Sequence, residues 1–276
     1  MFKRVITGAL LVAVFVPLLI FSDTVVFTLA MTLLSLVGAY EMLRCLKLHK
    51  DIVIALPSLL IAAGAPLLAR LVHDFALYAP WAISAVLIYL FWFLAYCVIK
   101  RGKIEYAHLS GLFMAIVYIS AGFASLLLLR DAPGGAYVFW LVFIGAWVTD
   151  TMAYFTGFFF GKHKLIVEVS PKKTVEGAIG GTLFSGIAYV IYGIVLSHLC
   201  DVRVNLIVLF IAGITAAVVS QFGDLAASII KRQSDIKDYG SLFPGHGGVL
   251  DRFDSIIALA PFILMMHSAP FMNLII

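Results

Sequence analysis

Nine long, uninterrupted apolar runs are the feature that most constrains how this chain can fold. They cover roughly residues 5–21, 24–43, 52–72, 78–99, 108–129, 136–160, 177–199, 204–230 and 255–275. A run of about 17–25 apolar residues is long enough to cross the hydrocarbon core of a bilayer as a helix. In lipid the backbone must pair internally, and continuous rather than alternating runs favour helices over barrel strands. The chain is therefore predicted to be an all-α polytopic membrane protein of about nine transmembrane helices.

The overall composition agrees with a chain whose main solvent is lipid. Hydrophobic residues make up 63% of the sequence and charged residues 12%, whereas soluble domains have about 45–50% apolar and about 25% charged residues. The connections between the runs are short, and no low-complexity tract or convincing repeat interrupts them. Residues 1–276 are therefore predicted to form a single integral membrane domain.

The lysines and arginines predict how the chain is oriented in the membrane. With a cytoplasmic N-terminus and nine spans, 16 of the 19 basic residues fall on the inner side, and only Arg70, Arg130 and Arg203 fall outside. Short cytoplasmic loops carry such an excess of basic residues. The C-terminus is therefore expected to be external. Residues 161–176 and 224–254, which are the richest inner segments, are expected to be cytoplasmic active-site loops.

Charged residues concentrate in the second of these segments. Residues 224–254 contain five aspartates and four basic residues in a chain that is otherwise poor in charge. Asp224, Ser228 and Lys231 are spaced i, i+4, i+7 and therefore share one helix face. A carboxylate near the membrane boundary is costly unless it is paired or bound to a cation. Both a structural ion network between Asp224 and Lys231 and a bound cation satisfy that requirement.

A glycine-rich loop, residues 237–248, separates the helix that carries Asp224 from the last predicted helix. Glycine allows main-chain N–H groups to approach a phosphate closely. Asp251 and Asp254 then follow at i, i+3 on one side of a helix N-terminus, and Mg²⁺ commonly takes one or two such carboxylates together with substrate phosphates. The structural alternatives are a flexible linker and, for His246, a turn histidine that bonds its own loop. A linker does not require Asp-Arg-x-Asp directly after it.

One continuous pattern runs from Ser228 to Asp254. It reads Ser228-Ile-Ile-Lys231-Arg232, then after four residues Lys237-Asp238-x-Gly240, and then Phe243-Pro244-x-His246-Gly247-Gly248-x-x-Asp251-Arg252-x-Asp254. This pattern resembles that of the CDP-diacylglycerol synthase (phosphatidate cytidylyltransferase) family, with no departure from it. The resemblance implies a multi-pass enzyme of the inner (plasma) membrane that faces the cytoplasm and acts in phospholipid biosynthesis. Such an enzyme transfers CMP from CTP to phosphatidic acid, which gives CDP-diacylglycerol and pyrophosphate. It further implies Mg²⁺, with a monovalent cation such as K⁺ beside it, and a homodimer.

A second stretch, residues 170–177, precedes the seventh apolar run. Ser170 as N-cap and Pro171 at the first helical position are typical of a helix start. A helix start does not explain why Lys172, Lys173 and Glu176 stand at a membrane edge. The stretch is similar to the segment that contacts substrate phosphate or nucleotide in this family. Gly177-x-x-x-Gly181 indicates close helix packing rather than chemistry.

The resemblance, together with the charge pattern, assigns roles to individual residues. Asp150 is an acid inside an apolar run and therefore a functional candidate by default; the resemblance places it near the lipid and cation site. Asp224 and Asp251 are expected to share Mg²⁺, with Asp254 as a third ligand or a partner of the ligands. The predicted catalytic residues are Asp224, Lys231, His246 and Asp251. The predicted substrate-binding residues are Asp150, Ser170, Lys172, Lys173, Thr174, Glu176, Ser228, Arg232, Lys237, Gly247, Gly248 and Arg252.

Two other functions remain open at this stage. A CTP-dependent polyprenol or phytol kinase is also a polytopic enzyme that needs acids, lysines and Mg²⁺, but it releases CDP rather than pyrophosphate. A transporter can also place an acid inside a helix, yet it is expected to have charges near the midplane and related halves. The concentration of charge in one inner segment favours the synthase.

Overall fold

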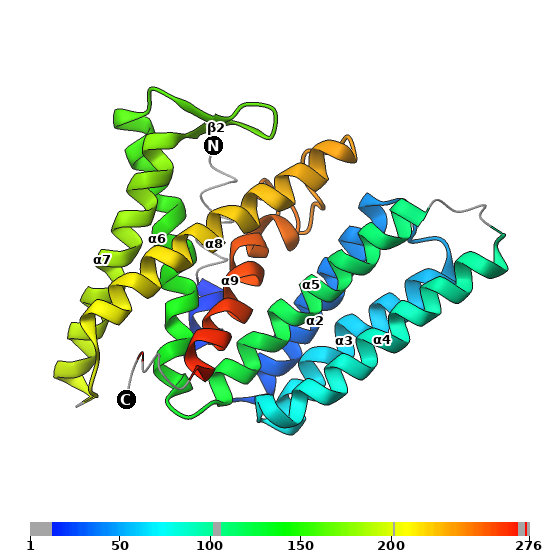
Figure 1. Cartoon of the computed structure of the whole chain (residues 1–276), viewed down its shortest axis with the longest axis horizontal. Helices are drawn as coiled ribbons and strands as arrows, with labels where there is room; N and C mark the ends of the chain where they lie inside the picture. Colours follow the sequence, from blue (N-terminus) through cyan, green and yellow to red (C-terminus); the bar gives the residue numbers. More distant parts are fainter. Residues whose placement is uncertain (1–12, 102–105, 201, 270–273, 275–276) are drawn as a thin grey trace. The chain divides into compact units, whose positions relative to one another are not determined.

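A computed structural model describes residues 13–101, 106–200, 202–269 and 274 of the chain (Figure 1). Residues 13–20 are helical and precede α2. The named elements are α2 (Val25–Cys45), α3 (Ile52–Val72), α4 (Phe75–Ile99), α5 (Tyr106–Asp131), α6 (Gly135–Phe160), β1 (Lys164–Ile166), β2 (Ser170–Thr174), α7 (Val175–Leu199), α8 (Leu206–Gln233) and α9 (Leu250–Ser268). Helices α2 to α8 begin and end within three residues of the predicted apolar runs.

The all-α polytopic membrane class is confirmed. Within the described residues, the seven helices α2 to α8 are long and apolar enough to cross a membrane. Helix α9 begins five residues earlier than predicted, and its first turns contain Asp251, Arg252 and Asp254. The first predicted run lies partly outside the described residues. Lys3, Arg4, Lys103 and the C-terminal Ile276 also lie outside them. The count of nine spans and the orientation therefore stay predictions.

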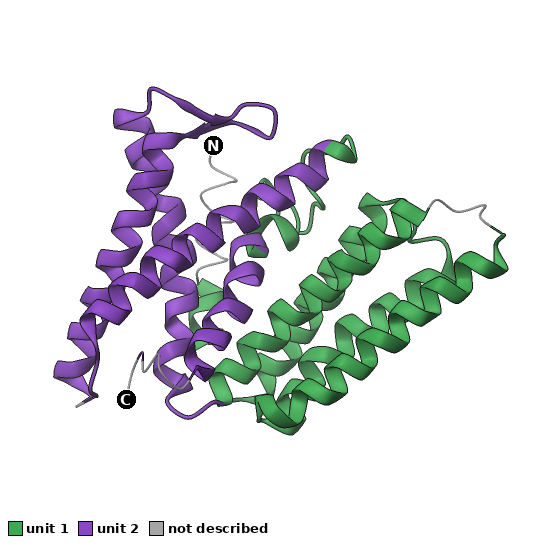
Figure 2. Ribbon diagram, in the orientation of Figure 1, with its two compact units in different colours: residues 1–131, 233–253 green, residues 132–232, 254–276 purple. Residues whose placement is uncertain are grey.

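The chain divides into two compact units, each made of two separate stretches of sequence (Figure 2). Unit 1 comprises residues 1–131 and 233–253, and unit 2 comprises residues 132–232 and 254–276. Unit 1 therefore contains helices α2 to α5 and the glycine-rich loop, and unit 2 contains α6, α7, α8 and most of α9. The prediction of one membrane domain is not tested by this division.

Unit 1 is a helical bundle in which α2, α3 and α5 pack against one another and α4 packs on α3. Its core side chains are apolar and fully buried on α5, where Leu112, Ile116 and Phe123 are examples. Hydroxyl groups inside the bundle bond to neighbouring helices: Ser35 Oγ donates to the Ala62 carbonyl at 2.7 Å. Such a buried hydroxyl would be costly without its partner.

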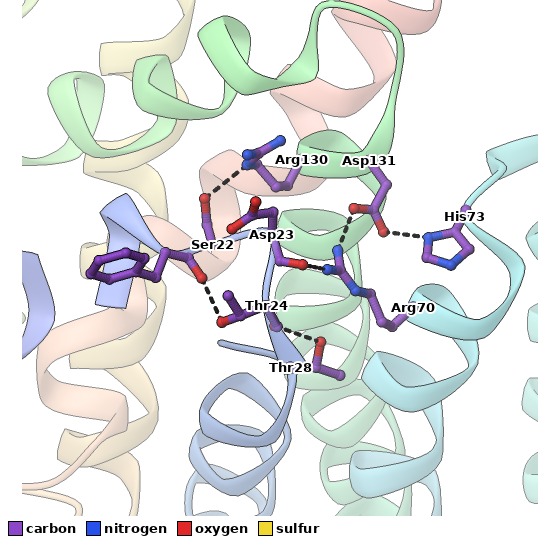
Figure 3. Close-up of polar contacts among 9 residues, drawn as sticks. Ser22, Asp23, Thr24, Thr28, Arg70, His73, Arg130 and Asp131 are labelled. Atoms are coloured by element: carbon purple, nitrogen blue, oxygen red, sulfur yellow. Dashed lines mark hydrogen bonds and ion pairs between the residues drawn. The ribbon is translucent and has the colours of Figure 1, made fainter. Parts of the chain in front are cut away.

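A polar network holds the helix ends of unit 1 together at the end of α5 (Figure 3). The Asp131 carboxylate accepts from the Arg70 guanidinium and lies 2.9 Å from His73 Nδ1. Arg70 also donates to the Asp23 carbonyl, and Arg130 Nε donates to Ser22 Oγ at 2.8 Å. Two of the three arginines predicted to be external therefore join the ends of α3 and α5 to the turn before α2.

Helices α6 and α7 of unit 2 lie side by side with little between their backbones (Figure 1). A Cβ added at Gly177 would lie 2.7 Å from the Ala153 carbonyl oxygen, and one at Gly181 would lie 2.7 Å from the Thr149 carbonyl oxygen. Real side chains do not come so close. The predicted packing role of Gly177 and Gly181 is therefore confirmed, because small residues let membrane helices approach closely.

A β-hairpin connects α6 to α7 and corrects one prediction. Strands β1 and β2 pair antiparallel, with Lys164 opposite Thr174 and Ile166 opposite Ser170. Ser170 is thus a strand residue and not the N-cap of a helix beginning at Pro171. Thr174 caps α7 instead, because its Oγ1 accepts from the Gly177 amide at 3.1 Å. A proline, which lacks an N–H group, is tolerated in such an edge strand.

Candidate active site

The Asp224 carboxylate, on the last turns of α8, has an ion partner on the hairpin. Lys173 Nζ lies 2.5 Å from Asp224 Oδ2, with side chains 28% and 26% exposed. Ser228 Oγ lies 3.4 Å from Asp224 Oδ1, so the predicted shared helix face is confirmed for these two residues. Both partners belong to unit 2. The pair joins two residues that the sequence had assigned separately to metal and to phosphate.

Asp254 lies in the same unit and is surrounded by charge. Its half-buried side chain feels repulsion from Asp224 and Asp150 and attraction from Lys231. The structure therefore brings four of the predicted site residues into one electrostatic cluster. Like charges held in a partly buried place repel one another, and a bound cation would relieve that repulsion.

The carboxylates of this cluster fit the chemistry of Mg²⁺, which prefers oxygen ligands. Among the described residues, no group of three or more His, Cys, Asp or Glu side chains converges closely enough to hold a metal ion by itself. Mg²⁺ usually takes one or two protein carboxylates and completes its shell with water and substrate phosphates. Asp224 and Asp254 are carboxylates of the kind that Mg²⁺ takes together with substrate phosphates.

Asp251 belongs to unit 1, where it organises the glycine-rich loop. Its Oδ2 accepts from the Tyr239 amide at 2.8 Å and from the Gly248 amide at 2.9 Å. Gly247 has a φ of +86°, a left-handed conformation that glycine adopts without strain. A Cβ at that position would also lie 2.7 Å from Asp251 Oδ2. Because Asp224 is in the other unit, its predicted sharing of a metal with Asp251 stays a prediction.

The centre of the loop is a hydrogen-bonded turn rather than an extended linker. The Phe243 amide donates to the Gly247 carbonyl at 2.9 Å, and the His246 amide donates to the Phe243 carbonyl at 2.8 Å. Arg252 Nε donates to the His246 carbonyl at 2.7 Å, which agrees with the expectation that Arg252 supports the fold or a phosphate rather than a metal. The buried Nδ1 of His246 bonds to none of the residues that the structure describes.

Glu41 on α2 is a residue that the sequence interpretation missed. Its side chain is buried, with 5% exposed, and its two oxygens accept from the amides of Val249 and Leu250, each at 2.9 Å. A Cβ at Gly248 would lie 2.2 Å from Glu41 Oε1, and one at Gly240 would lie 2.4 Å from it. These glycines therefore make room for a carboxylate. The rule that singled out Asp150, an acid inside an apolar run, applies equally to Glu41.

Glu176 and Thr174 join α7 to the base of the hairpin that carries Lys172 and Lys173. Glu176 accepts from the amides of Lys162 and His163, at 3.1 Å and 3.2 Å, and lies 2.6 Å from His163 Nδ1. With the Thr174 cap, this carboxylate attaches the base of the hairpin to the first turn of α7. Glu176 and Thr174 therefore have structural partners, and their predicted contact with substrate stays a prediction.

The sequence matches the model of the cytidylyltransferase family over residues 2–269. The chain belongs to this family. It is 33% identical over 271 residues to a phosphatidate cytidylyltransferase of Bacillus subtilis (strain 168), with 96% of each chain covered. It is 31% identical over 264 residues to one of Staphylococcus haemolyticus (strain JCSC1435), covering 94% of this chain and 95% of the other. It is 30% identical over 271 residues to one of Staphylococcus aureus (strain COL), covering 96% and 99%. The resemblance seen in residues 228–254 is confirmed.

In this cytidylyltransferase family member, three of the predicted phosphate-binding cations are exposed to solvent. Lys172 lies on β2, Arg232 lies at the end of α8, and Lys237 lies in the glycine-rich loop. Exposed cations are accessible to an incoming polyanion. Their contact with substrate stays a prediction, as does that of Ser170, Gly247 and Gly248.

Proposed function

We propose that this chain is a phosphatidate cytidylyltransferase, which transfers CMP from CTP to phosphatidic acid and releases pyrophosphate. The names of its relatives and the extent of the match support this activity. The observation in the structure that carries the proposal is the Lys173–Asp224 pair beside Asp254 and Lys231. An enzyme that joins two polyanions needs both cations for their phosphates and carboxylates for a divalent metal.

The reaction requires no nucleophile from the protein, because the acceptor phosphate is already an oxyanion. One of its oxygens forms a bond to the α-phosphorus of CTP, while the bond from that phosphorus to the bridging oxygen breaks and pyrophosphate leaves. The protein must offset the repulsion between the substrates and hold them in line. Lys172, Lys173 and Lys231 are proposed to neutralise phosphate charge, and Arg232 and Lys237 to add binding.

Mg²⁺ is the proposed metal, with Asp224 and Asp254 of unit 2 as its carboxylate ligands. When bound, it would neutralise charge on the nucleotide phosphates. Lys173, which pairs with Asp224 in the structure, is proposed to bind a phosphate oxygen. The additional ligand role predicted for Asp251 and a monovalent cation such as K⁺ beside the Mg²⁺ are part of the same proposal.

The proposed setting is the plasma membrane, with nine spans, a cytoplasmic N-terminus, a site that faces the cytoplasm, and a homodimer. Single cysteines introduced into a cysteine-free background can test the orientation. A cysteine at position 237 should react with an impermeant reagent only from the cytoplasmic side, and one at position 130 only from outside. Labelling of both positions from the same side would contradict the proposed topology. Chemical cross-linking in the membrane tests the dimer.

The activity itself is tested with the purified protein, phosphatidic acid and each nucleotide in turn, with and without Mg²⁺. Pyrophosphate release only with CTP and Mg²⁺ is the expected result. Release of CDP would instead indicate a lipid kinase, and absence of both products would contradict the proposal. Asp224→Asn should abolish most of the activity, whereas Glu168→Gln, which removes the same charge in the exposed turn between β1 and β2, should leave it unchanged.

A further inference from the structure

We propose that Glu41 is a positioning residue for the active-site loop, which holds the backbone of residues 248–250 and thereby the orientation of Asp251. This inference rests on the proposed function, because it assigns Glu41 an indirect part in that reaction. Glu41 lies on α2 and comes 208 residues before Val249 in the chain. Nothing in the segment around the loop itself predicts this contact.

The hydrogen bonds of Glu41 occupy the start of α9. The first amides of a helix have no partner within it and must be satisfied from outside. Val249 accepts the first helical bond, from the Phe253 amide at 3.0 Å, and thus takes the N-cap position with an apolar side chain that cannot cap. Glu41 replaces the missing cap, because its two oxygens bond to the amides of Val249 and Leu250. A negative charge is also favoured at a helix N-terminus.

The loop encloses the carboxylate from two sides. Cβ atoms at Gly240 and Gly248 would lie only 2.4 Å and 2.2 Å from Glu41 Oε1, whereas Cβ atoms at Gly64 and Gly111 would meet nothing within 4 Å. A Cβ at position 240 or 248 would therefore displace the Glu41 carboxylate from its present place. With the Glu41 carboxylate in place, neither position 240 nor position 248 has room for a residue larger than glycine. Glu41 therefore sets the path of the loop as well as its hydrogen bonds.

Asp251 continues the same arrangement. The amides of three successive residues, Gly248, Val249 and Leu250, all donate to carboxylates: the first to Asp251 and the next two to Glu41. Arg44 attracts the Glu41 charge and Asp251 repels it. If Glu41 is removed, two buried amides lose their acceptors and the backbone that orients Asp251 is released. The catalytic loss should therefore appear in kcat more than in the KM for CTP.

Glu41→Gln and Glu41→Ala test this inference in the full-length protein. Gln keeps one acceptor oxygen but turns an NH₂ group toward the other amide, so the effect should be graded from wild type through Gln to Ala. Hydrogen exchange of the 248–253 amides, measured by mass spectrometry, should become about 10- to 100-fold faster. The kcat should fall by about 10²-fold, the loss expected from misplacing a reacting group by about 1 Å, while the KM for CTP changes little.

Matched controls separate positioning from general destabilisation. Asp74→Ala removes a carboxylate cap from α4, where Asp74 accepts from the Leu77 amide at 3.0 Å, and Gly64→Ala adds a methyl group where space is open. Both should keep wild-type kcat and wild-type exchange at residues 248–253. Gly248→Ala should reproduce the Glu41→Ala exchange pattern with Glu41 still present, which covers the case that Glu41→Ala fails to fold.

Wild-type kcat and wild-type exchange at residues 248–253 in Glu41→Ala would overturn the inference. Equal losses in Asp74→Ala and Glu41→Ala would overturn it as well, because the effect would then be one of stability alone. An inactive wild-type protein would refute the proposed function instead. The exchange measurement needs no turnover and would still decide whether Glu41 holds the loop.

Discussion

The ion pair between Lys173 and Asp224 gives the sharpest test of the structure. Exposed ion pairs contribute about 0.2–1 kcal/mol, and breaking fully buried ones costs about 3–5 kcal/mol. With side chains 28% and 26% exposed, this pair lies between those limits, and we expect a coupling free energy of about 1–2 kcal/mol. At about 2–4 °C per kcal/mol for a chain of this size, the coupling corresponds to roughly 2–8 °C in the midpoint of thermal unfolding.

A double-mutant cycle measures that coupling directly. Lys173→Ala, Asp224→Asn and the double variant are compared with wild type by thermal unfolding in detergent, without nucleotide or Mg²⁺. The loss in the double variant should be smaller than the sum of the two single losses. Lys172→Ala, which removes the same charge from the adjacent exposed position, should change stability by no more than about 0.5 kcal/mol. Additive losses from Lys173→Ala and Asp224→Asn would refute the ion pair.

The same lysine variants also test catalysis. If Lys172 and Lys173 both contact substrate phosphate, replacing both with Ala should raise the apparent KM or lower kcat while the protein still inserts and folds. By analogy with other charge-stabilising groups, the loss in kcat is expected to be on the order of 10²–10³. Full activity of the double variant would mean that the two lysines only mark the cytoplasmic side.

Two further predictions concern stability, both measured by thermal unfolding. Gly177→Ala should destabilise the protein by about 1–3 kcal/mol, because the new methyl group would meet a carbonyl oxygen of α6 at 2.7 Å. Gly64→Ala, where the space is open, should be neutral or stabilising by up to about 1 kcal/mol. Equal effects of the two substitutions would contradict the close approach of α6 and α7. Asp131→Asn should cost about 1–3 kcal/mol, because a carboxylate only 11% exposed loses its charge beside Arg70. His73→Ala should cost less, because that ring is 60% exposed, and the reverse order would contradict the network.

The helices could be predicted from sequence because each depends on local information. A continuous apolar run of sufficient length has one stable form in lipid, and the spacing of Asp224 and Ser228 fixes a shared face within one helix. The hairpin could not be predicted in this way. Ser170 and Thr174 are both good capping residues, and only the pairing with residues 164–166 decides that the helix begins after the second.

The contacts that complete the candidate site depend on residues far apart in the chain. Lys173 and Asp224 were each identified as functional candidates, but the spacing along one helix could not reveal a partner on a hairpin. Glu41 was missed because its partners are main-chain amides, which have no signature in the sequence. The glycines of the loop were interpreted as room for phosphate, whereas Gly240 and Gly248 make room for that carboxylate.

The long separation between Glu41 and its partners has a consequence for biosynthesis. A ribosome that adds about 5–20 residues per second needs roughly 10–40 s to proceed from Glu41 to Val249, because 208 residues separate them. Throughout that interval α2 has been made, but the amides that bind its carboxylate have not. An acid in an apolar helix is costly to insert without a partner, so until Val249 is made the Glu41 charge must be offset by water, by a proton or by Arg44 on the same helix. Unit 1 therefore reaches its final form only after the helices of unit 2 up to α8 have been synthesised.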